Sequence, residues 1–71
     1  VVNMTDYVML VYEGPYSENP DIIHYTGDRQ GAIDYALEEH AFEVDIYEGT
    51  RIHPDAKSVC AVMYNGTIWE A

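Results

Sequence analysis

The stretch SVCAVMYNGTIWE, residues 58–70, decides the fold. Two runs rich in β-branched and aromatic residues flank Asn65-Gly66, and an Asn-Gly pair suits the positive φ angles of a type I′ turn. The pattern predicts a C-terminal β-hairpin in which Tyr64 faces Thr67 and Val62 faces Trp69. A hairpin of this kind makes its part of the sheet antiparallel.

Two further stretches have strand patterns. Residues 6–13, DYVMLVYE, are apolar and aromatic between polar ends, which predicts a strand buried on at least one face and stopped by Gly14-Pro15. Residues 42–48, FEVDIYE, alternate, with Val44 and Ile46 on one side. Between them, the segment around Asn19-Pro20 predicts a loop with at most a short edge strand over residues 22–25.

Three short sequences look alike: VYEGP at 11–15, IYEGT at 46–50 and MYNGT at 63–67. Each closes an expected strand with a tyrosine and then supplies a turn glycine. Their spacings are unequal, so the chain has no repeat architecture. Turn chemistry explains the likeness better than a shared binding motif does.

Residues 28–40, DRQGAIDYALEEH, carry the helical pattern, with N-cap residues at Thr26-Gly27-Asp28. Ile33, Ala36, Leu37 and His40 follow i, i+3, i+4, i+7 spacing and are expected to face the sheet. The opposite side is expected to be acidic with one aromatic residue. It comprises Asp28, Asp34, Tyr35, Glu38 and Glu39.

The order of these elements predicts an α+β domain: a small antiparallel sheet of three to five strands with one helix, about 28–40, packed on one face. The other sheet face has no second helix to cover it. Residues 1–5 are interpreted as a disordered tail or a cloning remnant, and residues 6–71 as a single small acidic domain.

Charge is the dominant feature of the composition. Thirteen Asp and Glu residues stand against three Lys and Arg residues, a net charge of −10. Because nucleic-acid binding needs cations, this balance argues against direct contact with DNA or RNA. The 48 % hydrophobic content indicates a folded chain rather than an acidic tail. No membrane span or signal peptide is evident, so the cytoplasm is expected, the host's if the source is viral.

The residues that could carry chemistry do not form a recognisable site. Cys60 lies in the middle of a strand without a neighbouring charge, so a core position is expected. His24, His40 and His53 lack metal-ligand spacing. Phosphate-loop, dinucleotide and nucleophile-elbow motifs are missing. We therefore expect no catalytic, cofactor or metal site and no enzyme activity.

The acidic residues suggest binding instead. An anionic surface with tyrosines attracts basic clefts, and Tyr12, Tyr35, Tyr47 or Trp69 could serve as rigid anchors. The expected partner is a basic nucleic-acid-binding protein, which the chain would block as a nucleic-acid mimic. A surface acidic only for solubility is the alternative explanation of the charge. The expected binding residues are Asp28, Asp34, Tyr35, Glu38, Glu39, Glu43, Asp45, Tyr47 and Glu48.

In size and charge the chain resembles the small acidic inhibitors that phages make against restriction, CRISPR or transcription machinery. The resemblance covers composition and length and includes no motif, so it implies no fold and no family. It does suggest an anti-CRISPR, anti-restriction or host-takeover role. The competing hypothesis is a structural or regulatory subunit that dimerises or docks through the uncovered sheet face, using Tyr7, Met9, Val11, Val62 and Trp69.

Overall fold

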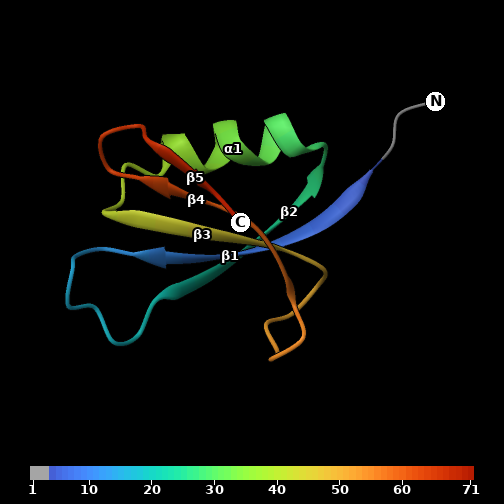
Figure 1. The fold of residues 1–71 in the computed structure, drawn as a ribbon, viewed down its shortest axis with the longest axis horizontal. Coiled ribbons are helices and arrows are strands. Elements are labelled where there is room, and N and C mark those ends of the chain that lie inside the picture. Colours follow the sequence, from blue (N-terminus) through green and yellow to red (C-terminus); the bar gives the residue numbers. More distant parts are fainter. Residues whose placement is uncertain (1–3) are drawn as a thin grey trace.

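A computed structural model describes residues 4–71 and places five strands in one antiparallel sheet with a single helix packed against it (Figure 1). The strand order is β2-β1-β3-β4-β5, so β2 and β5 form the edges. The predicted α+β class is confirmed. The strands are β1 (Thr5–Tyr12), β2 (Asp21–Gly27), β3 (Glu43–Glu48), β4 (Lys57–Met63) and β5 (Ile68–Glu70).

The antiparallel β1–β2 pair extends further than the sequence predicts at the end where Thr5 of β1 meets Gly27 of β2. Thr5 pairs with Gly27, so the strand begins one residue before Asp6 and Thr5 does not belong to a tail. Residues 1–3 of the predicted tail lie outside the described residues. The edge strand runs over Asp21–Gly27 and not only 22–25, because Pro20 precedes the strand and therefore removes no ladder hydrogen bond.

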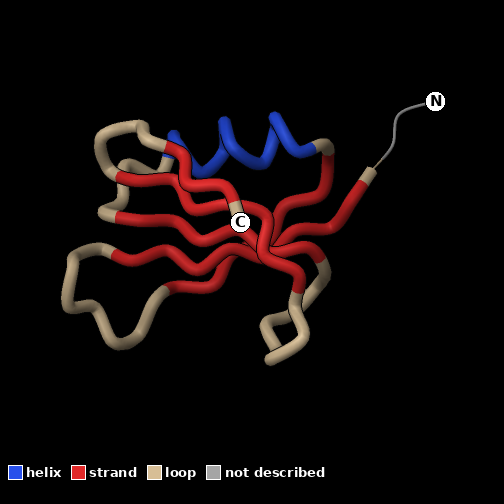
Figure 2. Tube along the Cα trace, viewed as in Figure 1, coloured by secondary structure: helices blue, strands red, loops and turns tan. Residues whose placement is uncertain are grey.

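The helix α1 spans Arg29–Glu38 and lies on one side of the sheet only (Figure 2). The Asp28 carboxylate caps it by accepting a hydrogen bond of 2.7 Å from the Gly31 N–H. The helix ends two residues before the predicted limit, because His40 adopts a left-handed conformation, with φ 53°, that turns the chain toward β3.

The helical face that meets the sheet differs from the predicted one. Its buried residues are Ala32, Ile33 and Ala36. Leu37 is 40 % exposed and His40 is exposed beyond the helix end, so their predicted burial against the sheet is wrong. The small alanines let the helix approach the strands closely, whereas Leu37 and His40 lie at the margin of this contact, where they line a small hollow with Val44 and Val62.

The core lies between α1 and the sheet. Alternate residues of the three central strands reach it, as period-2 side-chain geometry requires. The strand residues of this core are Tyr7, Met9, Val11, Val44, Ile46, Cys60 and Val62. The expected core position of Cys60 is confirmed, and burial raises the pKa of its thiol.

This arrangement corrects the predicted docking face. Tyr7, Met9, Val11 and Val62 are buried beneath the helix, so they cannot form an uncovered face. The face without a helix, here called the open face, is formed by the alternate residues. Its central row crosses all five strands through Ile22, Leu10, Asp45, Ala61 and Trp69.

The C-terminal hairpin forms, but its register differs by one residue from the prediction. Val62 pairs with Ile68, and Trp69 pairs with Ala61. The Met63 carbonyl accepts from Gly66 at 2.9 Å, and the Met63 N–H donates to Thr67 at 2.8 Å, which closes a three-residue loop. In the loop Gly66 alone has a positive φ, 86°, so the turn is not type I′. A one-residue change reverses the face of every side chain, and it places Trp69 on the open face.

Candidate protein-binding surfaces

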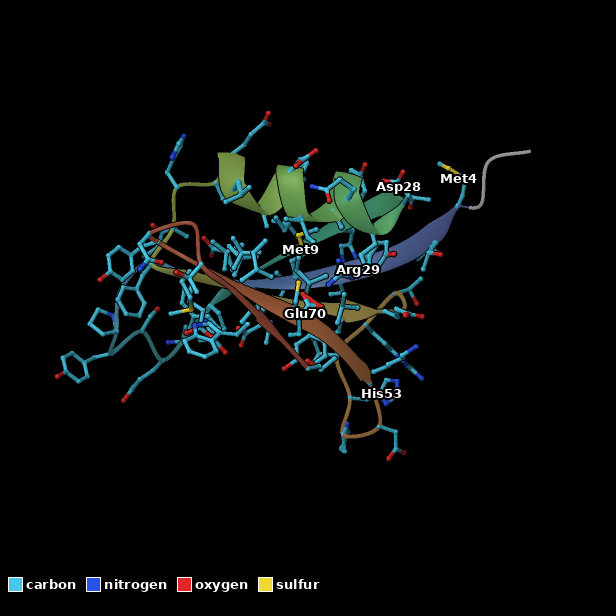
Figure 3. The ribbon with its side chains drawn as sticks, turned by 45° about the horizontal axis from the view of Figure 1, so that its top comes forward. Met4, Met9, Asp28, Arg29, His53 and Glu70 are labelled. Carbon is cyan, nitrogen blue, oxygen red and sulfur yellow. The ribbon has the colours of Figure 1, made fainter. Side chains whose placement is uncertain are left out.

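The acidic side chains are mostly free of basic partners. Two of the thirteen, Glu70 and Glu48, form ion pairs with Arg29 and Lys57 within residues 4–71, which leaves eleven without one. Arg29 and Glu70 point toward each other beside the helix N-terminus (Figure 3). No charged side chain of the described residues is fully buried. The negative charge is therefore available at the surface.

The first acidic group lies on the solvent side of α1. Asp34, Glu38 and Glu39 are exposed there, and these three with Tyr35 are called the helix surface below. Tyr35 is partly covered by the Tyr25 ring, with centroids 5.4 Å apart. The predicted member Asp28 is exposed, but its carboxylate serves as the helix cap. The sequence thus located this surface, with Asp28 in a structural role.

The strand acids do not lie beside the helix surface. Glu43, Asp45 and Tyr47 belong to the open face, because their neighbours Val44 and Ile46 point into the helix-side core. Glu48 is on the opposite side of the strand from Asp45, and it binds Lys57 at 3.3 Å. The nine predicted residues therefore divide between two faces of the molecule, and Glu48 does not extend the acidic side of β3.

Asp45 has the most unusual environment of the acidic residues. It lies at the centre of the apolar row, between Leu10 and Ala61, and its Oδ1 is buried without a hydrogen-bond partner. Burial raises the pKa of Asp45 to about 7, and the neighbouring Glu43 carboxylate acts in the same direction. Near neutral pH this carboxyl is divided between its two protonation states.

A hollow of about 200 Å³ lies next to these acids, between β3 and the loop that joins β1 to β2. Tyr12 lines it, and burial, followed by the Asp45 charge, raises the pKa of the Tyr12 hydroxyl. The sequence pointed to Tyr12, Glu43 and Asp45, but it could not reveal the loop and Phe42. The lining residues are Tyr12, Gly14, Pro15, Ser17, Phe42, Glu43 and Asp45.

Large apolar side chains are exposed at both ends of the central row. Ile22 is 58 % exposed on the β2 edge and Trp69 is 64 % exposed on β5. Tyr16, at the tip of the β1–β2 loop, is 93 % exposed. The open face thus presents aromatic side chains, which are enriched at the centres of protein–protein interfaces, together with aliphatic groups and two carboxylates.

The histidines lie apart. His24 is on β2, His40 follows the helix, and His53 is in the β3–β4 loop, where its Nδ1 accepts a hydrogen bond of 3.2 Å from the Asp55 N–H (Figure 3). Within residues 4–71, three or more potential metal ligands do not come together. Over the same residues, α1 is too short and too polar to be a membrane span.

Comparisons with known protein families, with curated proteins and with solved structures find no match to this chain. The surfaces described above therefore carry the functional argument.

Proposed function

We propose that this chain is a small non-enzymatic inhibitor that binds a basic, nucleic-acid-binding protein and competes with its nucleic acid. The observation that carries the proposal is the set of eleven acidic side chains without a Lys or Arg partner, of which Asp34, Glu38 and Glu39 lie on the helix surface and Glu43 and Asp45 on the open face. A cationic cleft that binds the negative charges of a phosphate backbone would also attract carboxylates displayed in this way.

The open face is the better candidate for the centre of the contact. It presents Tyr12 next to Glu43 and Asp45, and Trp69 lies in the same row beyond Ala61, so an approaching cationic side chain would meet both charge and aromatic surface. The helix surface carries only solvated acids beside the partly covered Tyr35. Its contribution would be long-range attraction, which accelerates encounter and is weakened by salt.

The partner class we propose comprises proteins of restriction, CRISPR or transcription machinery, the targets of phage inhibitors of similar size and charge. These proteins act in the cytoplasm, or in the host cytoplasm for a viral chain, and we propose the same compartment here. Direct nucleic-acid binding and membrane binding are not part of the proposal, since the net charge of −10 repels phosphates and anionic lipids alike.

The test is affinity capture from extract of the source cell, or of its host, on immobilised protein. Bound proteins are eluted either with rising salt or with duplex DNA at constant ionic strength. We expect one basic nucleic-acid-binding protein that both treatments release, and a blue shift of Trp69 emission when the purified partner is added. Retention of that partner in the presence of excess DNA would contradict competition.

A matched pair of variants separates binding from general charge attraction. At pH 8, where Asp45 is mostly ionised, Glu43→Gln with Asp45→Asn removes two charges from the open face, and Asp55→Asn with Asp21→Asn removes two exposed charges elsewhere. The first pair should weaken capture at least tenfold more than the second. If the two pairs weakened capture equally, capture would depend only on a non-specific attraction between this anionic chain and basic proteins.

Self-association through the open face is the second candidate, and the exposure of Ile22 and Trp69 supports it. A twofold dimer joins a surface to a copy of itself, so the acids of β3 would approach their own copies. This repulsion makes the dimer the weaker candidate near neutral pH. Light scattering over a concentration series measures it: a mass of twice 8.1 kDa would favour the dimer.

A further inference from the structure

The hollow beside β3 is open to solvent and bounded by two kinds of group. Glu43 and Asp45 supply carboxylates, and Tyr12 and Phe42 supply aromatic rings. The Phe42 ring is stacked on Tyr64, with centroids 5.4 Å apart and planes 11° from parallel, which restrains its orientation. This hollow is therefore anionic and aromatic at the same place.

The chain's own cations do not neutralise the hollow. Arg29 and Lys57 are paired with Glu70 and Glu48. Arg51 belongs to the β3–β4 loop, which lies at the opposite end of the sheet from the β1–β2 loop (Figure 1). The buried Oδ1 of Asp45 also has no donor from residues 4–71. Because no Lys or Arg of the chain compensates the Glu43 and Asp45 carboxylates that line the hollow, an external cation would be favoured here.

The geometry distinguishes among possible cations. A metal ion would need more ligands than the two carboxylates, and a group of three potential ligands is not found in residues 4–71. The volume of about 200 Å³ is below the roughly 300–1,000 Å³ of typical small-molecule pockets. A single protein side chain is a better match in size. Among cationic side chains, arginine both stacks on aromatic rings and donates from a planar fork to carboxylates.

We propose that this hollow is a binding subsite for the guanidinium group of an arginine on the partner protein, held by Glu43 and Asp45 against Tyr12 and Phe42. The inference rests on the proposed function, because it supplies the chemistry by which the open face would recognise a basic partner. It can be tested without that partner.

The probe is Nα-acetyl-arginine amide, titrated into the ¹⁵N-labelled full chain and followed by NMR. Probe chloride replaces sodium chloride so that the ionic strength stays constant. We expect saturable shifts at Gly14, Glu43 and Asp45, with a Kd on the order of millimolar. The uncharged isostere Nα-acetyl-citrulline amide should give no saturable shift, and Nα-acetyl-lysine amide should bind several-fold more weakly.

Two variants that each replace one carboxylate by its amide test where the arginine probe binds. Asp45→Asn should weaken arginine-amide binding about tenfold, whereas Glu38→Gln on the helix surface should change it less than twofold. Affinity should rise about tenfold from pH 6 to pH 8 in the native chain, because Asp45 ionises in this range, and should stay nearly constant in Asp45→Asn. The groups around Asp45 are Glu43 and Tyr47 on β3, Tyr12 on β1, and its non-ionisable strand partners Leu10 and Ala61.

Equal binding of the citrulline and arginine probes would overturn the proposal, as would equal effects of Asp45→Asn and Glu38→Gln. Shifts of similar size around Asp34 and Glu38 would do the same, since they would indicate diffuse attraction. None of these results tests whether the acidic surface as a whole captures a basic protein from extract. If instead the arginine subsite is found but extract capture recovers nothing, the proposed function fails while the subsite stands.

Discussion

Glu43 and Asp45 project from the same side of β3, and together with burial the Glu43 carboxylate raises the pKa of Asp45 to about 7. The folded-state pKa is thus above the unfolded value near 3.8. Between these values the folded state binds more protons than the unfolded state. The Asp45 contribution to stability must therefore fall as the pH rises from about 4 to about 7.

Replacing Asp45 by asparagine should remove this loss. We expect Asp45→Asn to be more stable than the native chain by about 1–2 kcal/mol at pH 8 and nearly equal to it at pH 4. The expected value is below the full linkage energy, because solvent reaches part of the carboxyl and screens it. Urea unfolding at pH 4, 6 and 8 measures the effect, with Asp55→Asn as a control of the same charge change. Parallel stability curves for the two variants would contradict it.

Because the helix covers only one face of the sheet, the same Ile→Val substitution should lower the free energy of unfolding by different amounts on the two faces. Ile46 is fully buried under α1, and Ile22 is mostly exposed on the open face. We expect Ile46→Val to lower the free energy of unfolding by about 0.5–1.5 kcal/mol and Ile22→Val to change it by less than about 0.5 kcal/mol. Chemical denaturation at a fixed pH compares them. A larger cost at Ile22 would mean that the covered face has been assigned to the wrong side.

That assignment shows how far the sequence could predict the fold. The strand at 6–13 is apolar on both sides, with Tyr7, Met9 and Val11 alternating with Val8, Leu10 and Tyr12. Its pattern indicates a buried strand but cannot select the side on which the helix packs. The elements, their order and the antiparallel pairing depend on local patterns, and these were predictable. The covered face depends on tertiary packing.

The candidate site was partly predictable for the same reason. Alternation in β3 placed Glu43, Asp45 and Tyr47 together, and this grouping is present in the structure. The hollow required the conformation of the β1–β2 loop, which brings Gly14, Pro15 and Ser17 next to β3 and which no periodic pattern encodes. Trp69 was expected on the same face as Val62, but a three-residue turn shifts the register by one and puts the two side chains on opposite faces.

The turn itself is testable with a matched glycine pair. Gly66 has φ 86°, whereas Gly14 has no positive φ, and a Cβ at either glycine would meet no atom within 4 Å. Gly66→Ala should therefore destabilise the protein by about 1 kcal/mol through backbone strain alone, and Gly14→Ala should be nearly neutral. Thermal unfolding of both variants compares them. Equal melting temperatures would contradict a left-handed Gly66.

The helix C-terminus offers a stabilising change. His40 holds a left-handed conformation that glycine adopts without a Cβ penalty. We expect His40→Gly to raise stability by about 0.5–1 kcal/mol. The neighbouring Glu39 is right-handed at φ −70°, so Glu39→Gly should instead lower stability, by up to about 1 kcal/mol. Urea unfolding of both variants at the same pH gives the two signs. A loss of stability in His40→Gly would show that the imidazole makes a contact that outweighs its backbone strain.

The separation of the acids onto two faces predicts that they affect binding kinetics differently. The helix surface is solvated, so Glu38→Gln with Glu39→Gln should mainly lower the association rate constant, by about threefold to tenfold at low salt, and this effect should shrink as salt screens the charges. Glu43 and Asp45 lie in the expected contact, so Glu43→Gln with Asp45→Asn should mainly raise the dissociation rate constant, at least tenfold. Surface plasmon resonance with the captured partner at two salt concentrations separates these rates. At pH 8, where Asp45 is mostly ionised, both variants remove two charges, so identical kinetics would mean that neither face forms the contact, and the open-face assignment would have to be abandoned.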